Sequence, residues 1–184
     1  MTVKIVTDSL SDITADLAQE LGVTVVPLTV SFGRESFLDR ITMSTEEFYR
    51  RLSYDPVWPT TTQPPPGDFA TVYNKLAAET DEILVITVSS KLSGTYDSAL
   101  NARTMVTGKC RIEVLNSLTV VMGLGLIVIA AAKAVKAGAN LDSLVELVKG
   151  CMPKSHSIMY FDTLKYLAKG GRIGKAQGLL GSLL

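Results

Sequence analysis

Clusters of hydroxyl-bearing residues follow several apolar, strand-like runs in this sequence of 184 residues. Residues 7–9, 89–95 and 116–117 each follow such a run and precede a helix-like segment. Ligands of open α/β sheets sit at the carboxyl ends of the parallel strands, so these clusters are predicted to lie together at that edge. No nucleophile–base pair and no metal-ligand spacing accompanies them. The pattern therefore favours holding an anionic group over breaking a bond.

Ser93 is the first candidate for an anion contact. It precedes a helix predicted from Gly94 and follows the strand-like, strongly apolar run 83–88. The first turn of a helix offers free N–H groups and partial positive charge to a carboxylate or phosphate. Serine is also a common N-cap, and that alternative stays open for Ser93.

The second candidate is the threonine run 60–62, which is followed by three consecutive prolines at 64–66. These threonines are predicted to open a helix, where stiff proline backbone could aim two hydroxyls at one oxygen. A plain polar loop is the alternative. Asp68 is the predicted N-cap of the helix that follows, and Asp8 with Ser9 is interpreted as an N-cap that braces a loop rather than as a metal or acid site.

Charge and cysteine content exclude several classes of protein. Lys and Arg number 18, as do Asp and Glu, and this balance argues against a nucleic-acid-binding protein, which would carry a basic face. The basic residues within 165–175 are interpreted as a solvated surface. Cys110 and Cys151 lie far apart and lack the spacing of zinc ligands.

No catalytic arrangement is evident in the sequence. His156 is the single histidine, and the GxSxG nucleophile elbow is absent. Gly123 and Gly125 lie inside an apolar helix-like run rather than in the strand-to-helix turn of a dinucleotide site, and the residues around Gly174 do not form a P-loop. The sequence predicts a binding protein rather than an enzyme, with neither a metal nor a cofactor.

The longest apolar stretch, 118–132, is about one turn short of a membrane span and is predicted to be a fully buried helix. With no secretory signal pattern at the N-terminus, we expect a cytoplasmic protein without stable membrane insertion. Gly123 and Gly125 each cost this helix about 1 kcal/mol relative to alanine. They indicate either close backbone approach or room for a ligand beside the apolar residues Val120, Val121, Leu124 and Leu126.

Strand-like runs alternate with helical patterns along the chain. This order predicts an α/β fold, in which a mostly parallel sheet carries helices on both faces. A last strand is predicted at 157–161, and a weak helix at the end of the chain. Residues 1–150 are assigned to one lobe and residues 151–184 to the incomplete beginning of a second.

Four motifs together resemble those of the DegV family of bacterial fatty-acid-binding proteins. They are TDSLSD at 7–12, PTTTQP at 59–64, SSKLSGTY at 89–96 and TLKYLAKGGRI at 163–173, and they span the whole chain. The resemblance implies a carrier that holds one fatty acid, with its tail buried and its carboxylate on hydroxyls of the second and third motifs. It places the carboxylate on Thr62 and Ser93, with Thr61 and Gly94 alongside.

The same resemblance implies a partner and a second lobe. Some DegV proteins are similar to the subunit that presents a fatty acid to a separate fatty acid kinase, which makes an acyl phosphate. The family has a second α/β lobe, truncated in this sequence, which supplies a histidine near the carboxylate; His156 does not occupy that position. The sequence also has Pro65 where the family often has serine, and Asn116 where aspartate is usual.

Two other functions are weighed against the fatty-acid carrier. One is a phosphotransferase or kinase-type subunit of related architecture, which would need a phosphate loop, acidic metal ligands or a catalytic histidine. The other is a regulatory module that binds a different small organic acid. Identification of the molecule that copurifies with the protein separates the three.

Overall fold

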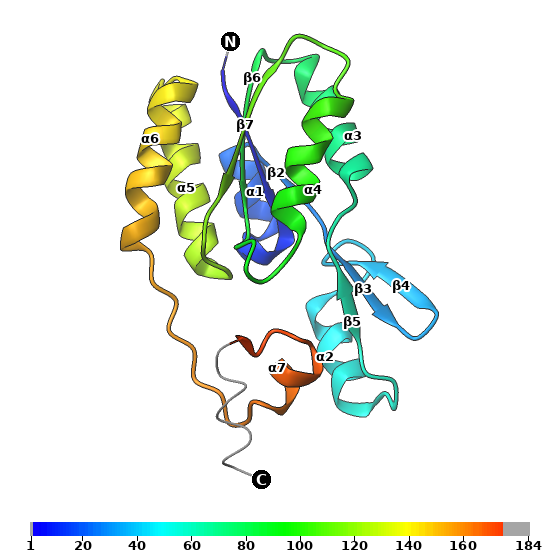
Figure 1. Cartoon of the computed structure of the whole chain (residues 1–184). Coiled ribbons are helices and arrows are strands. Elements are labelled where there is room, and N and C mark those ends of the chain that lie inside the picture. The colour runs from blue at the N-terminus through cyan, green and yellow to red at the C-terminus, as the bar shows by residue number, and fades with distance from the viewer. Residues whose placement is uncertain (1, 175–184) are drawn as a thin grey trace.

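The strand-like runs of the sequence form a four-stranded parallel sheet in the order β2-β1-β6-β7. The computed structural model describes residues 2–174 of the chain (Figure 1). Val6, at the centre of β1, lies opposite Thr24 of β2 and Val85 of β6. The strands are β1 (Lys4–Asp8), β2 (Val23–Val26), β6 (Glu82–Thr87) and β7 (Arg111–Asn116).

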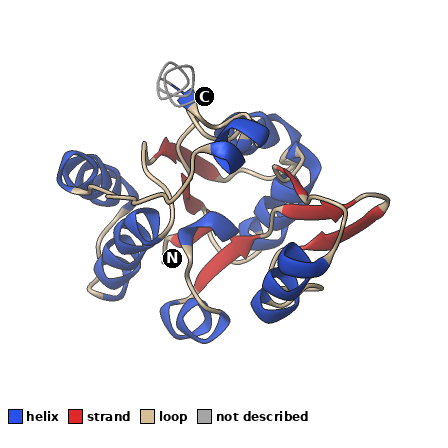
Figure 2. Ribbon diagram, turned by 90° about the horizontal axis from the view of Figure 1, so that it is seen from below, coloured by secondary structure: helices blue, strands red, loops and turns tan. Residues whose placement is uncertain are grey.

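Helices cover both faces of this sheet, as the sequence predicts (Figures 1 and 2). One face packs on α1 (Ala15–Leu21), α5 (Met122–Lys136) and α6 (Leu141–Cys151), and the other on α3 (Pro66–Ala77) and α4 (Thr95–Ala102). Side chains alternate along the strands, so Leu84 and Ile86 join the first core while Ile83 and Val85 join the second. Burial on both faces explains why β6 is an unbroken apolar run. This part of the fold also contains three short 3-10 turns, η1 (Ser9–Ser11), η2 (Arg103–Met105) and η3 (Met152–Lys154).

A second, antiparallel sheet in the order β4-β3-β5 lies beside the first. It consists of β3 (Thr29–Phe32), β4 (Glu35–Leu38) and β5 (Thr60–Thr62), and α2 (Thr45–Tyr54) packs on it. The threonine run is therefore a strand and does not open a helix: Thr61 pairs with Val30 of β3. The helix begins later, at Pro66, with Pro65 as its N-cap position and Asp68 in its first turn.

The chain leaves α6 and crosses in an extended path to the short helix α7 (Lys165–Lys169), which lies near α2 (Figure 1). The strand predicted at 157–161 is wrong, since no described residue pairs with this segment as a strand. Ile158 and Tyr160 are more than 90% exposed there. The helix predicted near the end of the chain lies outside the described residues.

The apolar stretch 118–132 differs from its prediction in two ways. Its helix, α5, begins only at Met122, because Leu118 and Val121 both have positive φ in the preceding turn. Leu126 is 60% exposed, so the helix is buried on one side only. No helix within residues 2–174 combines the length and apolarity needed to cross a bilayer.

Candidate ligand-binding site

Asp8, the last residue of β1, connects β1 by hydrogen bonding to the residue that follows β6 at the carboxyl edge of the parallel sheet. Its carboxylate is fully buried, and it accepts hydrogen bonds from the N–H of Val88 (2.8 Å) and the N–H of Leu10 (3.0 Å). Burial raises the pKa of Asp8 to about 6, because the loss of water around the charged form outweighs these two hydrogen bonds. Asp8 is the N-cap of η1, so the predicted bracing role is confirmed.

Ser9 and Asn116 brace the neighbouring loops. The Ser9 hydroxyl accepts a hydrogen bond from the N–H of Leu28 (3.1 Å). Asn116 Oδ1 accepts from the N–H of Ser90 (3.1 Å), and Asn116 Nδ2 donates to the Ser90 hydroxyl (2.7 Å). Asp8 and Asn116 therefore hold the start of the loop that carries Ser93, while Ser9 holds the loop between β2 and β3.

An apolar cavity of about 510 Å³ opens beside these braced loops. This volume lies within the range of small-molecule sites, about 300–1,000 Å³. Its polar lining residues come from β5 and the residue after it, the start of α4, and the segment beyond α7. The lining residues are Leu10, Leu28, Thr61, Gln63, Leu92, Ser93, Val120, Val121, Met159, Phe161, Leu167 and Arg172.

Two of the four predicted contact residues, Thr61 and Ser93, line this cavity. Gly94 is adjacent: a Cβ atom there would lie 2.8 Å from Gln63 Nε2, so the start of α4 and the end of β5 are close neighbours. Thr62 is not among the lining residues, whereas Thr61 and Gln63, two positions apart, both are. Its contact with a ligand stays a prediction.

Ser93 is not the N-cap of α4, since Gly94 occupies that position without a side-chain bond. The Ser93 hydroxyl accepts a hydrogen bond from the N–H of Thr95 (3.4 Å) and lies 2.8 Å from the Thr95 hydroxyl. It retains hydrogen-bonding capacity, because a hydroxyl has one donor hydrogen and two acceptor lone pairs. When the Thr95 hydroxyl donates to Ser93, the Ser93 hydrogen is free to be donated to an anionic group in the cavity.

Arg172 places a cation at the cavity. Lys165, Lys169 and Arg172 are exposed, as the sequence predicts, but the sequence did not indicate that Arg172 also lies beside Ser93. Its Nε donates to the carbonyl of Leu92 (3.2 Å), and Nη1 donates to the carbonyl of Gly170 (2.6 Å). Because Leu92 and Arg172 are 80 positions apart, only the folded chain brings this charge beside Ser93. Gln63 was also missed, although period-two alternation puts it on the face of Thr61.

Comparison with known proteins supports this description. Residues 2–184 match the family described as "Uncharacterised protein, DegV family". The chain belongs to the DegV family. A DegV domain-containing protein of Caldanaerobacter subterraneus subsp. tengcongensis is 42% identical over 182 residues, which make up 99% of this chain and 64% of that relative.

Two solved DegV structures share the fold. One is described as showing fatty acid binding of a DegV family protein from Thermus thermophilus. It has a TM-score of 0.86 and is 35% identical, and the match covers 100% of this chain and 65% of the Thermus chain. The other, DegV from Bacillus subtilis, described as a fatty acid binding protein, has a TM-score of 0.88 and 30% identity with the same coverage. The predicted α/β fold is thus confirmed, and the chain spans about 65% of the length of these DegV proteins.

The two glycines of α5 serve close packing in this DegV chain. A Cβ at Gly125 would lie 2.3 Å from the carbonyl oxygen of Ser11 in η1. A Cβ at Gly123 would lie 2.6 Å from the hydroxyl of Ser157, and the hydroxyl of Ser155 donates to the Gly123 carbonyl (3.2 Å). Of the two alternatives, close backbone approach accounts for both glycines.

Val121 lines the cavity in a strained backbone conformation, with φ 51° and ψ −146°. A positive φ is a genuine outlier for a β-branched residue, and such strain is typical of ligand-contacting segments. Leu124, in contrast, is buried in the core, so of the four apolar residues expected to wall a channel only Val120 and Val121 do so.

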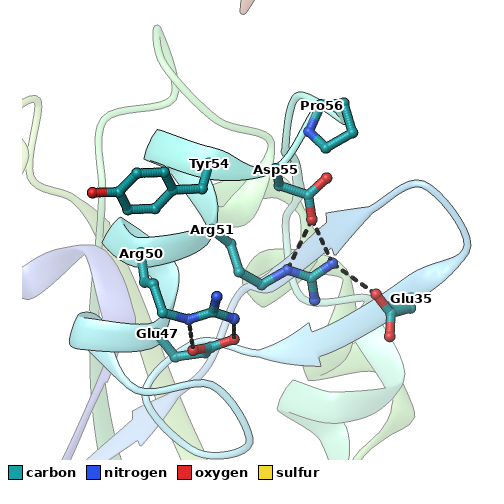
Figure 3. Close-up of a pocket in the computed structure, with 7 residues that line it drawn as sticks. All are labelled: Glu35, Glu47, Arg50, Arg51, Tyr54, Asp55 and Pro56. Carbon is teal, nitrogen blue, oxygen red and sulfur yellow. Dashed lines mark hydrogen bonds and ion pairs between the residues drawn. The ribbon is translucent and has the colours of Figure 1, made fainter.

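The remaining residues that could do chemistry, a histidine and a cluster of charged side chains, lie outside this cavity. His156 is exposed, and no group of three His, Cys, Asp or Glu within residues 2–174 could hold a metal ion. A second hollow, of about 400 Å³, lies on α2 and β4 (Figure 3). Its arginines are paired with carboxylates: Arg50 binds Glu47 (2.7 Å), and Arg51 binds Glu35 (2.7 Å).

Proposed function

We propose that this DegV chain binds one long-chain fatty acid in the 510 Å³ cavity. The observation that carries the proposal is the composition of the lining, eight apolar side chains with Thr61, Gln63, Ser93 and Arg172. The Thermus thermophilus and Bacillus subtilis relatives, which their descriptions connect with fatty acid binding, support the choice of ligand.

In the proposed complex the carboxylate lies between β5 and the start of α4. A carboxylate is costly to bury unless hydrogen bonds compensate it. The hydroxyls of Thr61 and Ser93 can donate to its oxygens, and the Arg172 guanidinium supplies opposite charge; charge-assisted hydrogen bonds of this kind are the strong ones. Thr62 remains a candidate for the same group from its neighbouring position on β5.

The acyl tail provides the main attraction. Each methylene group removed from water contributes about 0.8 kcal/mol, so long chains are favoured over short ones. The tail would lie against apolar lining residues such as Leu28, Val120 and Met159. A small polar acid would gain little from this lining, which weighs against the regulatory-module alternative.

We also propose that the complete protein presents its fatty acid to a separate kinase subunit rather than phosphorylating it. The support is the family resemblance, and the chain's own contribution would be to hold the carboxylate for transfer. Residues 151–184 would begin a second lobe after the lobe formed by residues 1–150. Addition of a bacterial fatty acid kinase subunit and ATP to the loaded protein should yield acyl phosphate, whereas the loaded protein with ATP alone should not.

Extraction of the purified protein with organic solvent, followed by mass spectrometry, tests the proposed ligand. We expect a long-chain fatty acid near one equivalent. Denatured and delipidated protein carried through the same extraction is the control. An extract that holds only nucleotides or sugar phosphates would support the phosphotransferase alternative and refute the proposal.

A further inference from the structure

Residues 155–172, here called the strap, cross the cavity from α5 to the loop before α4. At one end the Ser155 hydroxyl donates to the carbonyl of Gly123 (3.2 Å), and at the other Arg172 donates to the carbonyl of Leu92 (3.2 Å). Between these anchors the strap contributes a third of the cavity lining. Its lining side chains are Met159, Phe161, Leu167 and Arg172.

The α7 part of the strap has little packing of its own. None of the five residues of α7 is buried. Leu167 lines the cavity, while Tyr166 and Lys169, three residues apart and so on a shared face, contact Trp58 instead. The rings of Tyr166 and Trp58 stack with centroids 4.8 Å apart and planes 6° apart, and Lys169 Nζ lies 4.6 Å from the Trp58 ring centroid.

Trp58 is the fixed half of this contact. It lies between two prolines in the loop that joins α2 to β5. Asp55 holds the loop, because its Oδ1 accepts from the N–H of Val57 (2.9 Å) and its Oδ2 accepts from Arg51 (2.9 Å). Arg51 in turn lies 4.2 Å from the centroid of the Phe32 ring of β3 (Figure 3 shows the Arg51–Asp55 pair). The charged hollow on α2 therefore anchors the loop that presents Trp58.

We propose that Trp58, Tyr166 and Lys169 form a latch that holds the strap closed over the cavity and slows escape of its ligand. The identity of that ligand rests on the proposed function. A ligand that leaves on the strap side must displace Leu167 and Arg172, and these residues cannot move away with α7 until Tyr166 and Lys169 separate from Trp58. Aromatic stacking and a cation–π contact together slow such a separation by about tenfold.

Transfer of bound oleate to phosphatidylcholine vesicles, followed by stopped flow, tests the latch. We expect Trp58→Ala to raise the dissociation rate constant by about tenfold, and Trp58→Phe, which keeps a ring to stack on Tyr166, to restore most of the wild-type rate. Tyr160→Ala, which removes an exposed aromatic side chain of the strap that neither lines the cavity nor contacts Trp58, is the matched control and should leave the rate unchanged. An equal rate in Trp58→Ala and wild type would overturn the proposal.

A second measurement needs no ligand. Trp58 is the single tryptophan of the chain, so intrinsic emission reports on it alone. Tyr166→Ala should shift this emission to longer wavelength and increase its quenching by acrylamide, whereas Tyr160→Ala should do neither. Identical quenching in Tyr166→Ala and wild type would show that the latch does not form. Failure of the wild-type protein to bind oleate would refute the proposed function, and the quenching result would still decide the latch.

Discussion

Replacement of Asp8 by asparagine should reveal a carboxyl group that stabilises the fold more at low pH than at high pH. Asp8 is fully buried and its pKa is raised to about 6 from the ordinary 3.8. A group whose pKa is higher in the folded state contributes stability that is fully present below the unfolded pKa and lost as the pH rises through the folded one. Linkage with these two values gives a gain of about 1.4 kcal/mol when the pH falls from about 7.5 to about 5.

Asp8→Asn should therefore be destabilising at both pH values, and more so in acid. At about pH 7.5 the variant loses about 1–3 kcal/mol, because an asparagine amide can offer only one oxygen to the two N–H donors of Leu10 and Val88. The difference between wild type and variant should then widen by about 1.4 kcal/mol at about pH 5. Urea unfolding followed by circular dichroism measures both differences.

Asp142→Asn is the matched control for this experiment. Hydrogen bonding from the exposed Arg111 (2.7 Å) lowers the pKa of Asp142, so its titration lies further into acid. The difference between wild type and this variant should stay constant between about pH 7.5 and about pH 5. A wild-type to Asp8→Asn difference that is constant or narrows over the same interval would refute the reasoning about Asp8.

Three further changes test the site and the packing that supports it. Ser93→Ala and Thr61→Ala should each weaken the binding free energy of oleate, measured by calorimetry, by about 1–3 kcal/mol. The effect of the double variant should be smaller than the sum of the two, because both hydroxyls contact one carboxylate. Affinities equal to that of the wild type in both single variants would remove these residues from the site. Gly125→Ala should lower the unfolding free energy by about 1–3 kcal/mol, since its Cβ would collide with the backbone oxygen of Ser11. The control is Gly150→Ala on α6, where the added Cβ meets open space; it should raise the unfolding free energy by about 0.5–1 kcal/mol. Val121→Gly should raise the unfolding free energy by about 1 kcal/mol, because glycine adopts this backbone conformation without strain, and it should weaken oleate binding. A lower unfolding free energy in this variant would contradict the claim that the backbone of Val121 is strained.

Local signals in the sequence are sufficient to predict the parallel sheet and the helices that cover it. Strong apolar runs such as β6 mark buried strands, and the position of Asp8 at the end of β1 indicates its capping role. Local signals instead predict that Thr61 opens a helix, because its pairing with Val30 joins segments about thirty residues apart and leaves no local trace. Without that strand, the face of Thr61 could not be distinguished from the face of Thr62.

The path of the strap depends on contacts between distant parts of the sequence. Residues 157–161 are predicted to form a strand, yet they pair with no strand and instead place Met159 and Phe161 at the cavity. Arg172 reaches Leu92 across 80 positions, and Trp58 meets Tyr166 across more than a hundred. Contacts of this range depend on the complete fold, so neither the cation at the cavity nor the stacked rings could be read from composition or spacing.

A crystal structure of the protein with bound oleate tests the central claim most directly. The account predicts one acyl chain in the 510 Å³ cavity, with a carboxylate oxygen within hydrogen-bond distance of Ser93 Oγ and of Thr61 Oγ1, and with the tail against Leu28 and Val120. Oleate bound in the charged hollow on α2, or bound in the cavity with its carboxylate away from both hydroxyls, would contradict it.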